Sequence, residues 1–348
     1  MSQPPRNPSG PLPTEDGAPW LQPSGQADPA GTDAASRQGS MQGPAAAAPP
    51  STPSSPAPPA QPAAPPVAAA SSTAADSASS PGEKQRSQRE GQSAPSWLRD
   101  LAGAWIFYSV LPAWPGIAPR FERIARFAPW IGAVLGAVQA LLWGLLEGHV
   151  PLMAQVCLVL ALALVLSGGL HMDGAMDTAD GLAAGERLLE AMADSRVGAS
   201  GVQALVVVLL LRAGALAALG PLAPAALLWA AFWSRVAPLI AMARFPYLRE
   251  RGSAAFHRRH WAGLARELRP TLLLLAVLAL LSWQLRGSDL LPLPIAGLAL
   301  LPTLVVPQWL GRRLGGHSGD SYGACVEWSE SLALLVMALA LVFAGDRA

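Results

Sequence analysis

The chain has 348 residues, of which 51% are hydrophobic and 14% charged, and its formal net charge is +1 at pH 7. The arginines stand in clusters between apolar runs and form no basic face, so the sequence gives no indication of nucleic-acid binding. The two cysteines, Cys157 in an apolar run and Cys325 in a polar segment, exclude a disulfide-rich secreted fold and argue against a zinc centre.

The first quarter of the chain consists mainly of Pro, Ala, Ser, Gly and Gln, with Ala/Pro stretches at 45–50 and 57–70. Such a composition cannot bury enough apolar surface to offset the entropy of ordering, so we expect residues 1–95 to form a disordered tail. The tail does not have the basic start and apolar core of a signal peptide. We therefore expect one integral membrane domain at 96–348.

From residue 127 onward, apolar runs alternate with polar loops, and each run approaches the roughly 20 residues that cross a bilayer as a helix. The pattern predicts an all-α, polytopic membrane protein with about seven transmembrane helices, at 127–146, 150–167, 202–219, 222–243, 268–285, 290–310 and 331–344. The fifth run is purely apolar only at 271–281, so a re-entrant or tilted helix is the alternative there. Residues 97–119, with Pro112 and Pro115, favour an interfacial segment over an eighth span.

The arginines predict the orientation, because positive charge is retained in cytoplasmic loops. Three groups of arginines face one side of the predicted membrane, at 120–126, 244–269 and 312–313. The turns on the opposite side are short and hold one arginine, Arg286. We therefore expect the N-terminus and the three long loops in the cytoplasm, and the chemistry in those loops.

The first long loop carries Asp173, Asp177 and Asp180, which share one face if the segment is helical. Like charges along such a stripe, about 10 Å long, repel unless cations neutralise them, and carboxylate oxygens suit Mg²⁺ bridged to phosphate. The alternative is a solvated helix face or helix caps, which an acid-only stripe beside an apolar span disfavours. His171 suits a general base or a hydrogen-bonded helix residue equally well. Glycines at 168, 169, 174 and 181 leave room for backbone or substrate.

The last long loop carries a second acidic stripe of Asp320, Glu327 and Glu330, again on one helical face. Two such stripes at the same membrane face would hold two Mg²⁺ ions about 4 Å apart, as in two-metal phosphoryl transfer. The preceding Gly315-Gly316 pair would present backbone N–H groups to a phosphate, although such pairs also serve as flexible turns.

Two arginines, Arg212 and Arg235, lie inside apolar runs. A buried guanidinium is costly unless it is paired, so each is expected to face a carboxylate or a bound phosphate. For Arg235 we favour a clamp on substrate or carboxylate over a structural pairing, whereas for Arg212 both remain open. His257, His260 and Trp261 stand in an arginine-rich loop, which is typical of a charged surface at the membrane interface.

Taken together, these motifs resemble the cobalamin synthase family, the adenosylcobinamide-GDP ribazoletransferases. The resemblance extends from about residue 97 to the C-terminus. It rests on the runs at 168–174, 177–181, 192–198, 245–249 and 315–320, and on Arg235, Gly323, Ala324 and Glu327. One departure is Ser318, where many relatives have threonine, and the hydroxyl is retained.

The resemblance implies a magnesium-requiring enzyme of the bacterial inner membrane. In its reaction, a ribose hydroxyl of α-ribazole, or of its 5′-phosphate, attacks the β-phosphate of adenosylcobinamide-GDP, and GMP leaves. Carried onto this chain, the implied metal ligands are Asp173, Asp177, Asp180, Asp320 and Glu327. The implied catalytic residues are His171, Asp180, Asp194, Arg196 and Arg235. The implied substrate-binding residues are Gly168, Gly169, Arg235, Gly316 and Ser318.

Two other classes of membrane protein share parts of this pattern. A CDP-alcohol phosphotransferase also uses spaced aspartates and Mg²⁺, but its usual motif has an Ala-Arg pair after Asp-Gly-x-x, where this chain has Asp177-Thr178. A transporter would hold its charges near the bilayer midplane, whereas most of these lie at span ends. The sequence leaves open the phosphorylation of the acceptor, its lower base, and whether the protein forms homo-oligomers or associates with other biosynthetic enzymes.

Overall fold

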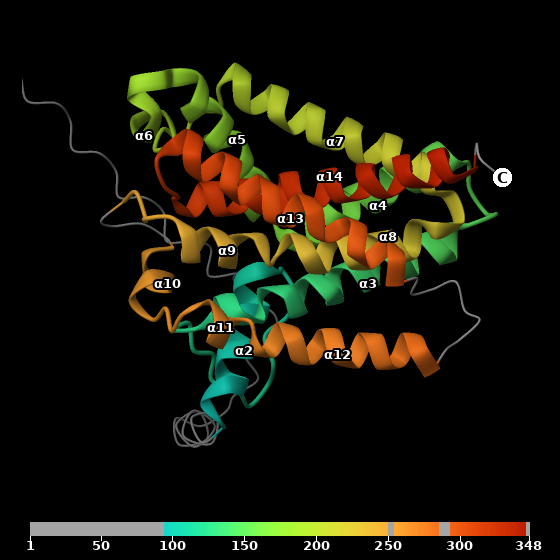
Figure 1. Cartoon of the computed structure of the whole chain (residues 1–348), viewed down its shortest axis with the longest axis horizontal. Helices are drawn as coiled ribbons and strands as arrows, with labels where there is room; N and C mark the ends of the chain where they lie inside the picture. Colours follow the sequence, from blue (N-terminus) through green and yellow to red (C-terminus); the bar gives the residue numbers. More distant parts are fainter. Residues whose placement is uncertain (1–93, 250–253, 285–292, 346–348) are drawn as a thin grey trace, which may run out of the picture. The chain divides into compact units, whose positions relative to one another are not determined.

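The computed structural model describes residues 94–249, 254–284 and 293–345, and the regular elements in these ranges are all helices (Figure 1). The predicted all-α fold is therefore confirmed. Residues 1–93, nearly all of the predicted disordered tail, lie outside the described residues. The α-helices are α2 (Ser96–Tyr108), α3 (Ala128–Leu146), α4 (Leu152–Ser167), α5 (Leu170–Ala184), α6 (Leu188–Ala191), α7 (Ala199–Leu219), α8 (Ala223–Ser234), α9 (Ala237–Arg244), α10 (Ala255–Arg259), α11 (Leu264–Glu267), α12 (Arg269–Gln284), α13 (Leu293–Leu314) and α14 (Gly319–Gly345). Short 3₁₀ helices are η1 (Ile124–Phe127), η2 (Gly185–Arg187) and η3 (Gly220–Leu222).

Three continuous helical stretches in the described ranges are long and apolar enough to cross a bilayer: Ile124–Leu146, Ala199–Arg244 and Gly319–Phe343. A fourth is obtained if Leu152–Ser167 and Leu170–Ala191, which are bent by 91° relative to each other, form one broken span. The predicted number of seven spans is therefore not confirmed.

The middle stretch, Ala199–Arg244, has 46 residues, about twice the length of a single span. It is divided at Gly220, whose φ of 50° ends α7. The chain runs in one direction along α7 and returns along α8 (Figure 1). The two spans predicted at 202–219 and 222–243 thus correspond to two helical passes within one continuous stretch.

The last three predicted spans differ most from the structure. The apolar part of α12 covers only Arg269–Leu281, and α13 contains Pro302 and Pro307 in its interior. The final helix, α14, starts at Gly319, well before the span predicted at 331–344. The second acidic stripe therefore lies on the same helix as the last span and is not in a loop, because nothing between Gly319 and the apolar run breaks the helix.

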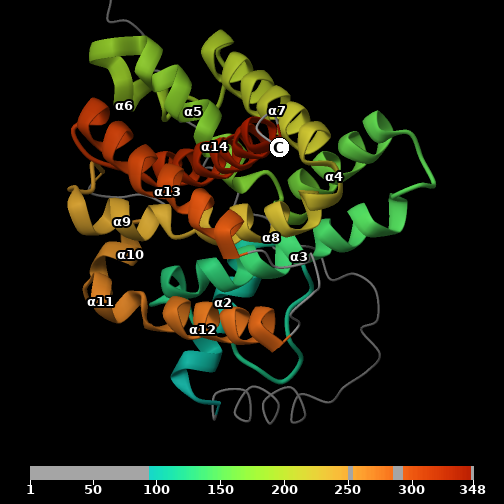
Figure 2. The same ribbon diagram turned by 45° about the vertical axis from the view of Figure 1, so that its right-hand side comes forward.

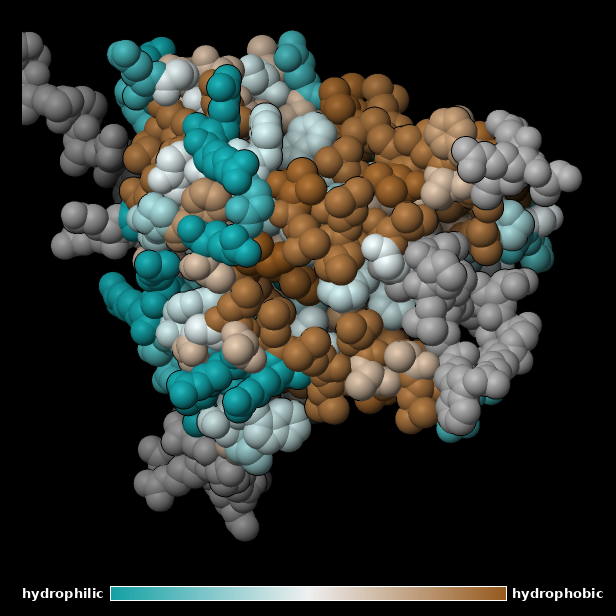
Figure 3. Space-filling view, viewed as in Figure 1, coloured by the Kyte–Doolittle hydropathy of each residue, from teal (hydrophilic) through white to brown (hydrophobic). Residues whose placement is uncertain are grey.

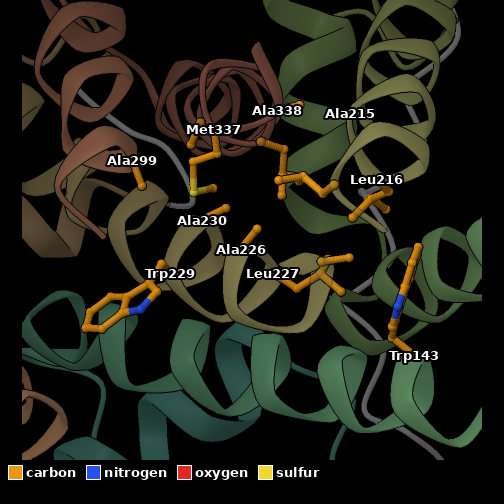
Figure 4. Packing of buried hydrophobic residues seen from close by; sticks show 14 of the residues in the cluster. Trp143, Ala215, Leu216, Ala226, Leu227, Trp229, Ala230, Ala299, Met337 and Ala338 are labelled. Carbon is orange, nitrogen blue, oxygen red and sulfur yellow. The ribbon is translucent and has the colours of Figure 1, made fainter. Parts of the chain in front are cut away.

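Helix α14 runs through the middle of the bundle and contacts α5, α7, α8 and α13 (Figures 1 and 2). Its C-terminal half contributes Met337 and Ala338 to an apolar core that also contains Leu216 of α7 and Trp229 of α8 (Figure 4). Because lipid tails are as apolar as these side chains, the core is stabilised mainly by close packing.

Helices α3 and α8 pack closely because glycines face α8. A Cβ on Gly136 would lie 2.8 Å from the carbonyl oxygen of Leu227, and one on Gly132 would overlap the carbonyl of Ala231. Small residues at such a crossing let two backbones approach, which is the usual basis of helix association in membranes. A side chain larger than hydrogen at either glycine would push α3 away from α8.

Hydrophilic residues gather at one end of the molecule, around α6 and the α9–α11 region, and apolar residues cover the middle of the bundle (Figure 3). The apolar band includes exposed side chains of α12 and α13, among them Leu272, Leu273, Leu301 and Trp309. Apolar surface of this kind suits contact with lipid. The side of a membrane that the polar end faces stays a sequence-based prediction.

Helix α2 is fixed to the rest of the chain by buried charge. Asp100 is fully buried and accepts hydrogen bonds from Arg120 at 2.6 Å and Arg126 at 2.5 Å. Arg123 similarly binds Glu267 of α11 at 2.7 Å. The segment predicted to lie at the membrane interface is thus a packed helix followed by an irregular loop, and its position relative to lipid stays a prediction.

Candidate active site

A pair of glycines turns the chain between α4 and α5. Gly168 and Gly169 both have positive φ values, 61° and 71°, a conformation that residues with a Cβ adopt only with strain. Helix α5 consequently leaves α4 at 91° and does not continue along it. This local role explains why the two glycines are adjacent, and the substrate contact predicted for them stays a prediction.

Helices α5 and α14 pack backbone to backbone beside their acidic residues. A Cβ on Gly174 would lie 2.5 Å from the carbonyl oxygen of Asp320, and a Cβ on Gly323 would lie 2.9 Å from that of His171. These two glycines bring the first acidic residues of the two stripes, Asp173 and Asp320, to the lining of one pocket.

Asp177, one turn further along α5, is half-buried and lies within electrostatic range of Asp173, Asp180 and Asp320. The structure therefore brings three of the predicted metal ligands, Asp173, Asp177 and Asp320, into one acidic group.

The pocket has an empty volume of about 800 Å³, including its open mouth. Its lining includes Asp173 and Asp320, and Arg235 adds a positive charge. Tyr108 and His257 belong to an aromatic wall, and the remaining lining is mainly apolar. An acidic group, a buried cation and an apolar wall together suit a ligand that has both a phosphate and an organic part.

The start of α14 is held by backbone pairing with the segment that follows α9. Leu248 N donates to His317 O at 2.8 Å, and His317 N donates to Pro246 O at 2.9 Å. This pairing places Arg249 against Asp320, with Nη2 of Arg249 3.1 Å from the Asp320 carboxylate. A second cation therefore stands beside the acidic group.

Ser318 caps the N-terminus of α14. Its hydroxyl accepts from Ser321 N at 3.2 Å, and the Ser321 hydroxyl accepts from Ser318 N at 2.8 Å. Gly316 packs against Pro246 and Leu248 with a φ of 158°. Both residues thus shape the turn that carries Asp320, and the substrate contact predicted for Ser318 and Gly316 remains to be tested.

Asp180 has a structural partner that the sequence did not indicate. Its two carboxylate oxygens accept from Gly198 N and Gly201 N, both at 2.8 Å, at the first turn of α7. Donor groups at a helix N-terminus favour a negative side chain. Asp180 therefore joins α5 to α7, and its predicted metal-binding and catalytic roles stay predictions.

Glu327 and Glu330 of the second acidic stripe lie among buried arginines. Glu327 is 2.7 Å from Arg212, and Glu330 is 2.7 Å from Arg235 and 3.8 Å from Arg212. All four side chains are at most 6% exposed, so the two negative charges balance the two positive ones within the spans. Glu327, a predicted metal ligand, is thus paired with Arg212 and is not among the residues that line the pocket.

Arg235 is paired with a buried carboxylate and also lines the pocket, and the predicted contact with substrate stays a prediction. Its Nη1 donates to Glu330, Ser234 and the Ala231 carbonyl, which fixes the guanidinium at the break between α8 and α9. Its Nε is buried without a hydrogen-bond partner among the described residues, and the side chain lines the pocket. A bound anion would satisfy this donor.

Asp194 and Arg196 form an exposed pair outside the residues that line the pocket. Arg196 Nη2 is 2.6 Å from Asp194, and the Arg196 side chain is 87% exposed. The side-chain hydrogen bond from Arg196 lowers the pKa of Asp194 to about 2. The structure does not bring this predicted catalytic pair to the acidic group, and its contribution stays a prediction.

Sequence reasoning missed three residues near the pocket: Tyr108, His257 and Arg249. His257 is 6% exposed, and burial lowers its pKa to about 3, so it is a neutral group and not part of the charged surface expected for its loop. Tyr108 ends α2 and stacks on His171 at a centroid distance of 6.0 Å. Of these three residues, only Arg249 could have been found from the sequence, because it belongs to the 245–249 motif.

The acidic group fits Mg²⁺ as a set of donors. Among the described residues, no three His, Cys, Asp or Glu side chains converge into a ready-made metal cage. Mg²⁺ commonly uses one or two carboxylates and takes its other ligands from substrate phosphates and water. Asp173, Asp177 and Asp320 offer oxygen donors of that kind beside the pocket.

Comparison with known proteins identifies the family of this chain. The family model described as cobalamin-5-phosphate synthase matches residues 100–338. Two proteins named adenosylcobinamide-GDP ribazoletransferase, from Prochlorococcus marinus strains MIT 9303 and MIT 9313, are each 60% identical to this chain, over 258 and 255 residues. Each alignment covers 71% of this chain and 98% of the relative. A third protein of that name, from Prochlorococcus marinus strain SARG, is 45% identical over 255 residues, which is 72% of this chain and 98% of the relative.

No solved structure matches the chain. The family model covers more than half of the sequence and includes every residue that lines the pocket. The chain belongs to the cobalamin-5-phosphate synthase family.

Proposed function

We propose that this protein transfers the adenosylcobinamide-phosphate group of adenosylcobinamide-GDP to a ribose hydroxyl of α-ribazole or of its 5′-phosphate. The observation that carries the proposal is the placement of Asp173, Asp320 and Arg235 on one pocket, in a chain 60% identical to a protein named adenosylcobinamide-GDP ribazoletransferase. The products are GMP and adenosylcobalamin or its 5′-phosphate.

The reaction exchanges one phosphate linkage for another. The hydroxyl oxygen of the acceptor forms a bond to the β-phosphorus of the donor, and the bond from that phosphorus to the oxygen shared with GMP breaks. GMP leaves with the bonding electron pair, and the hydroxyl proton passes to a base. Because negative charge develops on the phosphoryl and leaving oxygens, catalysis depends on positioning and charge stabilisation.

Asp173, Asp177 and Asp320 are the residues that would hold Mg²⁺, which when bound neutralises charge on a diphosphate. Arg235 would donate from its buried Nε to a phosphate oxygen, and its contact with Glu330 keeps the guanidinium oriented toward the pocket. Arg249 would supply a further positive charge beside Asp320.

His171 is the base that we propose for the acceptor hydroxyl. It lines the pocket, it is 5% exposed, and its Nδ1 has no hydrogen-bond partner among the described residues. Neutral imidazole has one nitrogen that accepts a proton, and the hydrogen bonds made by the ring decide which nitrogen that is. The hydroxyl of a bound acceptor would provide the missing partner.

We further propose that the site opens to the cytoplasm of a bacterial cell. The pocket is lined by residues of α9 and α10, which lie at the polar end of the bundle (Figures 1 and 3). Most of the arginines stand in the long loops between predicted spans, and cytoplasmic loops of inner-membrane proteins retain such positive charge. Charged substrates and products would then exchange with the cytoplasm without crossing the apolar band.

The direct test is to supply detergent-purified protein with adenosylcobinamide-GDP and α-ribazole, with and without Mg²⁺, and to separate the products by chromatography. The proposal predicts that GMP and a cobalamin product form in equal amounts and that both require Mg²⁺ and the acceptor. GMP release without the acceptor would indicate a hydrolase. No release by folded protein would refute the proposed transfer.

A further inference from the structure

Part of the pocket lining is an aromatic wall. Tyr108 and His171 stack with an interplanar angle of 25° and a centroid distance of 6.0 Å. Phe107 and His257 meet edge to face at 6.1 Å. All four side chains line the pocket, and they come from α2, α5 and α10, which are far apart in the sequence. Flat rings assembled in this way suit a flat ligand.

One nitrogen in this wall has unused hydrogen-bonding capacity besides Nδ1 of His171, the atom proposed to meet the ribose hydroxyl. Nδ1 of His257 is buried without a hydrogen-bond partner among the described residues. The His257 side chain is only 6% exposed and lines the pocket. Buried polar atoms in folded proteins are almost always paired, so the wall suits a ring that offers a nitrogen or hydroxyl.

Much of the remaining lining is apolar. It includes Ala125 of η1, Ala128 at the start of α3, and Leu239 and Met242 of α9. A guanine ring carries an amide and an amino group that would lie unpaired against such side chains, and burial of unpaired polar groups is costly. A benzimidazole-type ring has only two ring nitrogens, and one of them is bonded to the ribose in the nucleoside.

We propose that Tyr108, His171 and His257 form the subsite that holds the planar heteroaromatic base of the acceptor nucleoside. This inference rests on the proposed function and identifies the part of the pocket that selects the acceptor. With the base at the aromatic wall, the ribose lies between His171 and the acidic group, where the donor phosphates are held. The guanine of the donor lies outside this wall.

The first test measures binding of α-ribazole alone to the full-length protein in detergent by isothermal titration calorimetry. Stacking of a base on an aromatic side chain contributes enough that Tyr108→Leu should weaken binding about tenfold. Tyr108→Phe keeps the ring and should bind within about twofold of the wild type. Trp105→Leu is the matched control, because it removes a ring from the same helix outside the pocket lining.

The second test uses steady-state kinetics of GMP release. Tyr108→Leu should raise the KM for α-ribazole about tenfold while the KM for adenosylcobinamide-GDP changes by less than about twofold, since only the acceptor meets the ring. An equal rise in both KM values would indicate a structural defect and overturn the subsite. The same conclusion would follow if Trp105→Leu weakened α-ribazole binding as much as Tyr108→Leu.

Competition on the wild-type protein tests the choice of ligand without any substitution. Guanosine at the same concentration should fail to displace α-ribazole, and displacement would assign the wall to the donor. Failure of the proposed function would give another result. The wild type would then bind α-ribazole more tightly than Tyr108→Leu does, but it would release no GMP.

Discussion

Replacing Glu330 with glutamine should strongly destabilise the spans. Arg212, Arg235, Glu327 and Glu330 form a buried group of two positive and two negative charges, each side chain at most 6% exposed. Glu330→Gln keeps the shape but leaves two guanidinium groups facing one carboxylate. Removal of one partner from a buried ion pair costs about 3–5 kcal/mol. At about 2–4 °C per kcal/mol for a domain of this size, the unfolding temperature should fall by about 6–20 °C.

Fluorescence-monitored thermal unfolding in detergent measures this change, with Glu122→Gln as the matched control. Glu122 is 48% exposed and pairs with Arg120 at 3.1 Å, so its substitution should cost less than about 1 kcal/mol. The double substitution Arg235→Met with Glu330→Met restores neutrality and should recover most of the stability. The double variant should not release GMP, because it lacks Arg235, which lines the pocket. An unfolding temperature of Glu330→Gln equal to that of Glu122→Gln would show that the buried ion pairs do not stabilise the spans.

Three further substitutions test separate parts of the site. Asp180→Ala should lower the free energy of unfolding by about 0.5–2 kcal/mol, because it removes the cap of α7. Asp180→Asn keeps a hydrogen-bond acceptor, so it should lose turnover with a smaller loss of stability. Equal turnover in Asp180→Asn and the wild type would refute the metal-binding role of Asp180. His257 has a pKa of about 3 in the folded protein and about 6.5 in the unfolded chain, so the unfolded chain takes up the proton first as the pH falls. The contribution of the neutral His257 side chain to the free energy of unfolding is therefore present above pH 6.5 and is lost as the pH falls below that value. The loss should be about 1.4 kcal/mol per pH unit below 6.5, and thermal unfolding from pH 8 to pH 5.5 should show a flatter profile for His257→Gln; identical profiles would contradict the burial of a neutral imidazole. Arg196→Ala should lower kcat/KM without changing the unfolding temperature, because the side chain is 87% exposed, and an unchanged kcat/KM would remove Arg196 from the catalytic set.

The helical fold and the meeting of two acidic segments could be predicted from the sequence, because apolar runs and i, i+4, i+7 spacing are local patterns. The number of spans could not. Hydropathy separated the two passes of Ala199–Arg244 at Gly220, but it does not show that α14 begins at Gly319 and contains both the acidic residues and the last span. These features depend on backbone conformation and on packing between distant segments.

Site residues that belong to charged local motifs could be predicted from the sequence. Residues that reach the pocket only through tertiary contacts were missed. Asp173 and Asp320 were recognisable as carboxylates beside apolar runs. Their approach depends on Gly174 and Gly323, whose contact joins segments about 150 positions apart. Tyr108 and His257 carry no spacing signal, because a single aromatic residue in an apolar or basic segment has the same local pattern whether it faces lipid, core or ligand.

The most direct test of the central claim is the Mg²⁺ dependence of GMP release by the wild type and by Asp320→Asn, with Glu122→Gln as the control. If Asp173, Asp177 and Asp320 hold the ion, Asp320→Asn should lower the rate at saturating Mg²⁺ by about 100-fold or more, and it should require more Mg²⁺ for half-maximal rate. The unfolding temperature should stay close to that of the control. A wild-type rate and a wild-type Mg²⁺ requirement in folded Asp320→Asn protein would contradict the account.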